Sequence, residues 1–345
     1  MVDSSSKAAG PSLFYRLTAN ANTLLKLLIW TTIFAGLLLL SGAAFTAART
    51  SRAEAAHPPV GAFMQQPGVR LHYRVTGPAT PGKPALFLLH GATTNLNDFF
   101  SLTDRLSASL QVVAVDRPGA GYSHQTGTQW MNPAAQAQAI LALQLELGIP
   151  RAVWAGHSLA GSVVMAGLLD APEQVVGGVM LAGAAYPWDG GVDWINHVPG
   201  VPVLGPLVTH SLIAPAGSLR LDSGIINGFA PDPVIPSYRE RSGIDLYLRP
   251  GHFAATARDI RQLSEYLVEP SRRYGEITQP VLLVHGDADT IVPAWNHADR
   301  LVEVLPAVTY QRLPGTGHQP HHVHADRVAG WIETFIDEQA SGVVQ

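Results

Sequence analysis

The chain has 345 residues, of which 47% are apolar and 14% are charged, and its formal net charge is −4. One α/β domain with an insertion fits this length, and the weakly acidic balance argues against a nucleic-acid partner, which usually selects a basic surface. The absence of cysteine excludes disulfides, zinc–thiolate sites, iron–sulfur clusters and a cysteine nucleophile.

An uncharged apolar segment covers residues 27–48. As a helix it would measure roughly 33 Å at about 1.5 Å per residue, enough to cross a hydrocarbon core of about 30 Å. Three basic residues precede it, Lys7, Arg16 and Lys26. This bias predicts a cytoplasmic tail at residues 1–26 and a single-pass membrane protein whose main body lies on the non-cytoplasmic side.

The same segment has a second interpretation as a signal peptide, with the small residues Gly42, Ala43 and Ala44 as its cleavage site. The protein would then be exported without an anchor. We favour the anchor because the apolar run is longer than a typical signal core. Residues 49–68 contain three prolines and no clear period, so they are interpreted as a linker, and this disfavours a buried core helix at 27–48.

From residue 69 onward, short apolar runs alternate with helical patterns. The expected strands are 69–75, 85–89, 111–115, 151–155, 175–181, 280–284 and 309–313, and the expected helices are 98–110, 133–147, 159–169, 294–305 and 323–336. Continuous apolar runs are typical of strands buried on both faces of a parallel sheet. The alternation predicts an α/β fold with a mostly parallel central sheet flanked by helices.

The alternation breaks in the middle of this region, where prolines and glycines are frequent and amphipathic pieces replace the strands. We therefore assign residues 69–186 and 279–340 to the α/β core. Residues 187–278 are interpreted as a helical lid inserted between two strands of the sheet.

The strongest functional signal is a small-x-Ser-x-small string at residues 156–160, centred on Ser158. It lies between an expected strand and an expected helix, and a serine on such a sharp turn has its hydroxyl pushed clear of the sheet. The first N–H groups of the helix favour negative charge, so the N–H of Leu159 is a candidate oxyanion donor. This setting favours a nucleophile over a plain helix N-cap serine.

A nucleophilic serine needs a base, and the base needs an acid that orients it. Both should follow strands at the carboxyl edge of the sheet. Asp287 and Asp289 follow the strand at 280–284, and His318 follows the strand at 309–313. The chain thus supplies a serine, an acid and a base in that order, with either aspartate available as the acid.

These residues resemble the α/β-hydrolase family. Residues 286–293 match its G-x-x-D-x-x-V-P string, which implies that Asp289 is the acid and leaves Asp287 as a loop or capping residue. Residues 315–318 match its G-x-G-H string, which implies that His318 is the base.

Two further strings extend the resemblance across about residues 69–336. Residues 90–92 resemble the family's H-G-x oxyanion string, which implies the N–H of Ala92 as the second donor beside Leu159. Residues 116–123 resemble its D-x-x-G-x-G-x-S turn, which implies structural roles for Asp116 and Arg117. His90 and His157 are expected to pack near the site without a catalytic role.

The resemblance implies a serine hydrolase that cleaves an ester-type bond through an acyl-enzyme, without a cofactor or a metal. Apolar lid residues, Trp194 and Phe229 among them, favour an apolar small-molecule ester as substrate. Carbon–carbon bond hydrolases of ring-cleavage products and cofactor-free perhydrolases share the triad and stay open as alternatives. So does a catalytically silent binding or sensor protein. The oligomeric state stays open.

The histidines near the C-terminus raise the question of a metal site. The family match accounts for His318, and the others, His321, His322 and His324, are expected on a partly exposed loop and helix start. No metal site is therefore expected.

Overall fold

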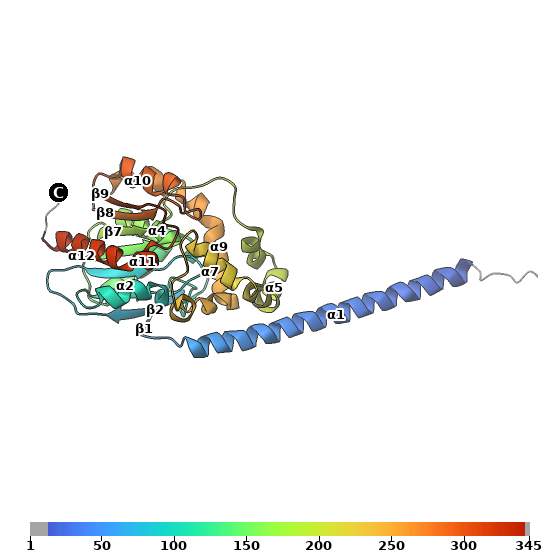
Figure 1. The fold of residues 1–345 in the computed structure, drawn as a ribbon. Helices are drawn as coiled ribbons and strands as arrows, with labels where there is room; N and C mark the ends of the chain where they lie inside the picture. Colours follow the sequence, from blue (N-terminus) through green and yellow to red (C-terminus); the bar gives the residue numbers. More distant parts are fainter. Residues whose placement is uncertain (1–12, 342–345) are drawn as a thin grey trace, which may run out of the picture.

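The structure is a computed structural model that describes residues 13–341. The first part of the expected tail at residues 1–26, including Lys7, lies outside the described residues. An α/β body carries one long helix, α1 (Leu13–Ala56), which projects far beyond it (Figure 1).

Within residues 13–341, a nine-stranded sheet forms the centre of the body, in the order β1-β2-β4-β3-β6-β7-β8-β9 with β5 paired to β2. The strands are β1 (Ala62–Gln66), β2 (Val69–Thr76), β3 (Ala85–Leu89), β4 (Val112–Val115), β5 (His124–Gln125), β6 (Ala152–His157), β7 (Val175–Leu181), β8 (Val281–Gly286) and β9 (Val308–Leu313). Pairing is parallel from β4 through β9 and antiparallel around β2. The expected mostly parallel sheet is confirmed.

Helices cover both faces of this sheet. The helices of the α/β body are α2 (Phe100–Leu106), α3 (Pro133–Glu146), α4 (Gly161–Asp170), α10 (Ala298–Val304), α11 (Pro320–Val323) and α12 (Ala325–Ser341). Side chains of α3 and α4 pack on one face, and side chains of α2 and α12 pack on the other. All residues of β3, β4, β6 and β7 are buried, which explains their continuous apolar runs.

Four short helices and one longer helix, α9, occupy the region expected to be the lid. They are α5 (Leu204–Ser211), α6 (Ile213–Ser218), α7 (Leu221–Phe229), α8 (Tyr238–Ser242) and α9 (Pro250–Leu267). The 3-10 turns of the chain are η1 (Leu96–Phe99), η2 (Gln129–Met131), η3 (Ser158–Ala160), η4 (Trp194–Gly200), η5 (Ile244–Leu248), η6 (Pro270–Arg272), η7 (Tyr274–Glu276) and η8 (Ala294–Asn296). The lid has a small core of its own around Phe229 and Tyr238.

The prediction of a linker at residues 49–68 is wrong for most of that segment, which forms the end of a helix and a strand. The helix α1 continues to Ala56, because the segment after residue 48 is rich in alanine and other helix formers. Strand β1 then pairs with β2 through a tight turn at Pro67 and Gly68. Gly68 has φ +79°, which suits a turn with proline before glycine. Strand β1 escaped prediction because it is a mostly exposed edge strand without a buried face.

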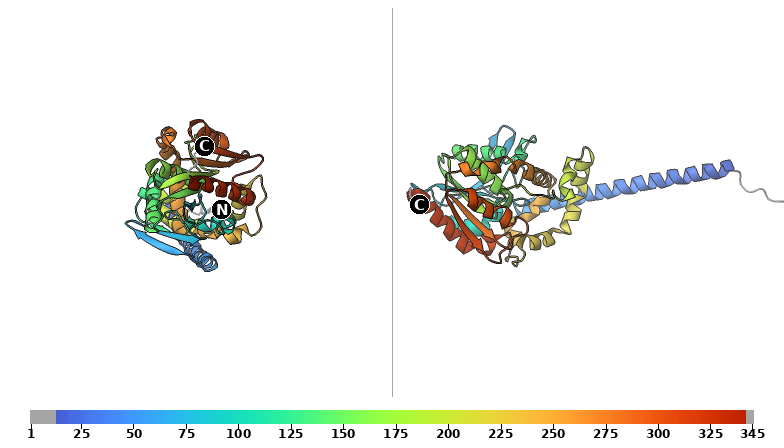
Figure 2. Two further views of the ribbon diagram at one scale, coloured as in Figure 1. Left: turned by 90° about the vertical axis from the view of Figure 1, so that its left-hand side faces the viewer. Right: turned by 90° about the horizontal axis from the view of Figure 1, so that it is seen from above.

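Helix α1 begins well before the expected segment at 27–48 as well as ending after it. Residues 23–56 of this helix are long and apolar enough to cross a membrane, a test that a signal sequence near the N-terminus also passes. Its last turns pack on the body next to α5 and α6. In the right view of Figure 2 the free part of α1 points away from the body.

Candidate active site

Ser158 lies on the sharp turn between β6 and α4. Its backbone φ is +53°, a left-handed value that residues other than glycine rarely adopt. The turn is tight: a Cβ at Gly156 would lie 2.5 Å from the Ala160 carbonyl oxygen, and a Cβ at Gly161 would lie 2.7 Å from the Gly183 Cα. Glycine is therefore required by packing at positions 156 and 161, and strain is retained at Ser158 itself.

Asp289 and His318 follow β8 and β9, which are neighbours in the sheet. The His318 Nδ1–H donates to Asp289 Oδ2 at 2.7 Å. The other carboxylate oxygen, Oδ1, accepts from the backbone N–H groups of Ile291 and Val292 at 2.8 and 2.9 Å. Asp289 is thus fixed on both oxygens, and it orients the His318 ring so that Nε2 is available on the other side.

The environment of Asp289 keeps it ionised. Burial alone would raise its pKa, but hydrogen bonds from His285 and His318 hold the pKa of Asp289 well below its ordinary value. His285 Nε2 lies 3.4 Å from Asp289 Oδ2 and donates to the Val292 carbonyl at 2.7 Å. Asp287, the other candidate, is exposed, and its Oδ1 accepts from the Gly315 N–H at 2.7 Å.

Two cavities meet at Ser158. A cavity of about 720 Å³ is lined by Ser158, Ala92 and Leu159 together with apolar side chains that include Trp188. A second cavity of about 260 Å³ runs under the lid and is lined by Ser158, Ala92 and His318, among others. Ser158 and His318 both line the smaller cavity. Among the hydrogen bonds of residues 13–341, none joins these two side chains directly. Such bonds are often loose before substrate binds.

The lid contributes unequally to these cavities. Phe229, expected as a pocket residue, lines the smaller one and is buried. Trp194, expected to do the same, lines neither cavity and is 72% exposed. Its position on η4 at the outside of the lid could not be deduced from its apolar character.

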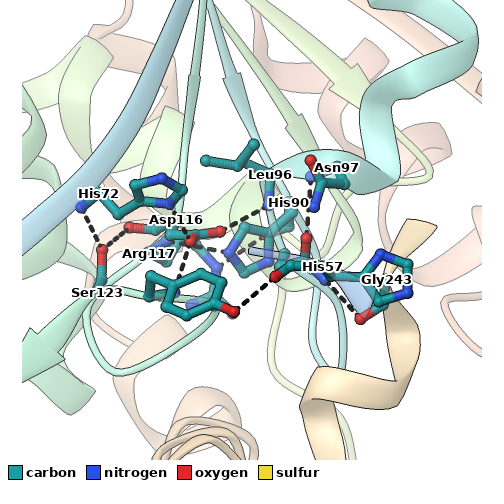
Figure 3. Close-up of polar contacts among 12 residues, drawn as sticks. His57, His72, His90, Leu96, Asn97, Asp116, Arg117, Ser123 and Gly243 are labelled. Atoms are coloured by element: carbon teal, nitrogen blue, oxygen red, sulfur yellow. Dashed lines mark hydrogen bonds and ion pairs between the residues drawn. The ribbon is translucent and has the colours of Figure 1, made fainter. Parts of the chain in front are cut away.

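A buried polar network holds the loop that contains Ala92 (Figure 3). Arg117 donates through its side chain to the carbonyls of His90 and Gly91 at 2.8 and 3.0 Å, and its backbone N–H donates to His90 Nε2 at 3.0 Å. Asp116 accepts from the Leu96 N–H at 2.7 Å and pairs with His72. The expected structural roles of Asp116, Arg117 and His90 agree with these contacts.

The same loop lies directly against the serine turn. A Cβ at Gly91 would lie 3.0 Å from both the His157 Nδ1 and the Ser158 Cβ. The parallel pairing of Leu89 with Gly156 explains this closeness, because both strands end at one edge of the sheet.

The histidines after His318 correct one expectation. His321 and His322 are buried, where a partly exposed position was expected, because α11 turns them inward behind the site. The His157 ring packs against His318 and His321, with ring centroids 4.8 and 4.4 Å away. Burial and the neighbouring His318 lower the pKa of His157 to about 3, so its ring is neutral.

Several contacts of these buried histidines were not predicted from the sequence. His157 Nε2–H donates to the His318 carbonyl at 2.9 Å and so helps to fix the loop that contains His318. Asp98, on η1, accepts from the Tyr238 hydroxyl at 2.8 Å and lies 3.5 Å from His322. One carboxylate oxygen of Asp98 and one ring nitrogen each of His157 and His321 lie within 4.8 Å of one another. Asp98 carried no signal because it lies far from the other two in sequence.

Comparisons with known proteins agree with this architecture. A model of the alpha/beta hydrolase family matches residues 86–331. The chain is 29% identical over 266 residues to the magnesium-chelatase 30 kDa subunit of Rhodobacter capsulatus, covering 76% of this chain and 89% of that protein. It is 28% identical over 264 residues to the pimeloyl-[acyl-carrier protein] methyl ester esterase of Xanthomonas oryzae, covering 73% and 95%.

One solved structure aligns over nearly the whole chain. A bacterial membrane phospholipase A matches with a TM-score of 0.59 at 21% identity, over 92% of this chain and 99% of that chain. At this identity the likeness concerns the fold.

Proposed function

The chain belongs to the alpha/beta hydrolase family, and from this premise we propose that it hydrolyses an ester-type bond of an apolar small molecule. In this proposal Ser158 is the nucleophile, His318 is the base and Asp289 is the acid that orients the base. The observation that carries it is the strained turn at Ser158, which shares a cavity with a His318 ring oriented by Asp289.

The mechanism follows from the positions of the protons. His318 Nδ1–H is committed to Asp289, so Nε2 takes the Ser158 proton as the hydroxyl oxygen attacks the carbonyl carbon. The ionised Asp289 stabilises the imidazolium that results. The N–H groups of Ala92 and Leu159 stabilise the oxyanion. The protonated His318 then gives its proton to the leaving alcohol, and water resolves the acyl-enzyme by the reverse sequence.

The cavity supports an apolar acyl group as the recognised part of the substrate. Leu159, Ile260, Leu263 and Val292 line the larger cavity beside Ser158, and such surfaces bind apolar groups with few polar contacts for orientation. The relative from Xanthomonas oryzae is named as a methyl ester esterase, which supports an ester over a carbon–carbon bond. Neither step of this mechanism uses a metal or a cofactor.

We extend the proposal to location: α1 is an uncleaved membrane anchor, and the hydrolase body lies on the non-cytoplasmic side. The packing of residues near Gly42 and Thr46 against the body supports retention of the helix, since cleavage at residues 42–44 would remove the helix that these contacts need. The phospholipase A that aligns over 92% of the chain is named as a membrane protein.

A fluorophosphonate probe tests the nucleophile. The full-length protein should be labelled on Ser158, and Ser158→Ala should lose the label and at least about 10³-fold in kcat on a short ester. Ser271→Ala, at a partly exposed position on η6 that lines neither cavity, is the matched control and should keep both. Full labelling of Ser158→Ala would refute the assignment. An unlabelled wild-type protein that folds normally would favour the non-enzymatic binding protein instead.

A further inference from the structure

The position of the lid relative to α1 has a consequence for how the enzyme meets the membrane, provided that α1 is the membrane anchor proposed above. Gly42 of α1 lies directly against the Ser211 carbonyl at the end of α5. Further along α1, Arg49 pairs with Asp245 at 2.5 Å, and Glu54 pairs with Arg249 at 3.0 Å.

These contacts set the depth of the lid. The first charged residue after Lys26 is Arg49, which marks the end of the uncharged segment. Gly42 precedes Arg49 by seven residues, which is roughly 10 Å along a helix at about 1.5 Å per residue. The end of α5 therefore contacts α1 about two turns inside the segment that crosses the bilayer, and the body cannot lie wholly above the lipid.

The part of the lid that leads into this contact, at the start of α5, is apolar and exposed. We define the lid edge as residues 201–207, in which every residue except Gly205 is exposed to solvent. Val203, Leu204 and Leu207 are 82%, 58% and 44% exposed. Contiguous exposed apolar residues of this kind mark an interaction surface.

The sequence around the lid edge has the same character. Residues 194–219 contain no Asp, Glu, Lys or Arg, in a chain that is 14% charged overall. Leu219, at the other end of this stretch, is 87% exposed. In Figure 1 and in the right view of Figure 2, α5 stands at the end of the body from which α1 departs.

Charged groups lie beside the last turns of α1, where Arg249 pairs with Glu54. Arg249 and Arg258 line a cavity of about 710 Å³ beside the last turns of α1, together with Arg70 and one acidic residue, Glu54. Apolar side chains at the level of the span, with arginines at the level where it ends, match the change from acyl chains to phosphate headgroups.

We propose that the lid edge inserts into the leaflet next to the hydrolase body, so that the enzyme contacts the membrane through both α1 and α5. An insertion of about 5–10 Å is typical of interfacial elements and agrees with the contact of α5 two turns inside the span. A second copy of the chain would also cover apolar residues. The membrane is the better occupant because α1 already holds the lid edge at its surface.

The chain contains no cysteine, so single cysteines report single positions. Leu204→Cys and Leu207→Cys test the lid edge in the full-length protein. Leu28→Cys, in the free part of α1, is the control for the anchor. Val302→Cys, which is 40% exposed on α10, a helix of the α/β body outside the lid, is the control for an apolar surface position in water.

Each variant is labelled with an environment-sensitive fluorophore and placed in nanodiscs of phosphatidylcholine and phosphatidylglycerol in equal parts, with or without lipids that carry a quencher near the headgroup. We expect blue-shifted and quenched emission at Leu204, Leu207 and Leu28, and neither change at Val302.

The outcomes separate the insertion of the lid edge from the anchor on which it depends. A changed emission at Leu28 with water-like emission at Leu204 and Leu207 would overturn the insertion of the lid edge and leave the anchor intact. Water-like emission at Leu28 would overturn both. A blue shift at Leu204 that the lipid quencher does not reach, with cross-linking between two Leu204→Cys chains, would assign the surface to a second copy and overturn the insertion.

Discussion

Buried histidines predict how the stability of the fold depends on pH. Among the described residues, five histidines with lowered pKa values are at most 3% exposed. Burial lowers the pKa to about 3 for His157, His252 and His297, and well below the ordinary value for His90 and His321. They are neutral in the folded protein and gain protons on unfolding below about pH 6.5.

The sign and size follow from proton linkage. Because the unfolded chain binds more protons than the folded chain below about pH 6.5, stability is present at neutral pH and is lost as the pH falls. At pH 5, about 1.5 units below the unfolded pKa, each histidine contributes a loss of about 2 kcal/mol. Five would contribute up to about 10 kcal/mol, which is comparable to the whole stability of a typical domain.

One group acts in the opposite direction. Burial raises the pKa of Asp259 to about 6, although Arg117 lies 2.9 Å away. The folded protein therefore binds a proton there before the unfolded chain does. At pH 5 this offsets only about 1.4 kcal/mol, less than one histidine, so acid destabilisation dominates.

Urea unfolding of the full-length protein in mild detergent, followed by tryptophan fluorescence at pH 7 and pH 5, measures this effect. His252→Gln should reduce the loss of unfolding free energy between the two pH values by about 2 kcal/mol, one histidine's share. His197→Gln, at an exposed position, should leave the loss unchanged. A total loss below about 2 kcal/mol in the wild-type protein would show that the buried histidines do not govern the acid response.

Three further predictions concern the site and its supports. Asp289→Asn should lower kcat by about 10⁴-fold because the amide favours the wrong histidine tautomer, whereas Asp287→Asn should have a small effect. Steady-state kinetics on a short ester measure both variants, and the reverse ranking would exchange the roles of the two aspartates. Gly156→Ala should cost about 1–3 kcal/mol of unfolding free energy by overpacking, while Gly330→Ala, which meets no atom within 4 Å, should gain roughly 0.5–1 kcal/mol. Trp188→Leu, which enlarges the cavity assigned to the acyl group, should shift preference toward longer acyl chains with little change on an acetate ester. Equal effects on all chain lengths would indicate simple loss of lid packing.

The features that sequence could predict are those with a local physical cause. The strand at 85–89 is buried on both faces, so its apolar run predicted the observed bounds of β3. The Ser158 turn was predictable because a strand, small residues and a helix must adjoin there for the backbone to pass. Asp289 and His318 each follow a strand, and loops after strands of a parallel sheet meet at one edge, so the two residues were expected to lie close together. The structure joins them by a hydrogen bond.

The features that sequence did not predict depend on contacts between distant segments. Nothing local distinguishes the buried His321 from an exposed loop histidine, because its surroundings come from Asp98 and His157 on other strands and turns. Likewise the outer position of Trp194 depends on how η4 sits on α9. In each case the residue type suggested burial or exposure, and tertiary packing reversed it.

The largest correction, at residues 49–68, changes the meaning of the anchor. A flexible linker would let the body drift above the membrane, and removal of residues 1–50 would then be harmless. Instead α1 runs unbroken to Ala56, with Thr46 and Ala53 buried against the body and Arg49 paired with Asp245. Truncation at residue 50 would remove Thr46 and Arg49 and uncover the surface of the lid that they pack on. Because one continuous helix both contains the apolar segment and packs on the lid, the anchor proposed above would fix which lid residues face the bilayer.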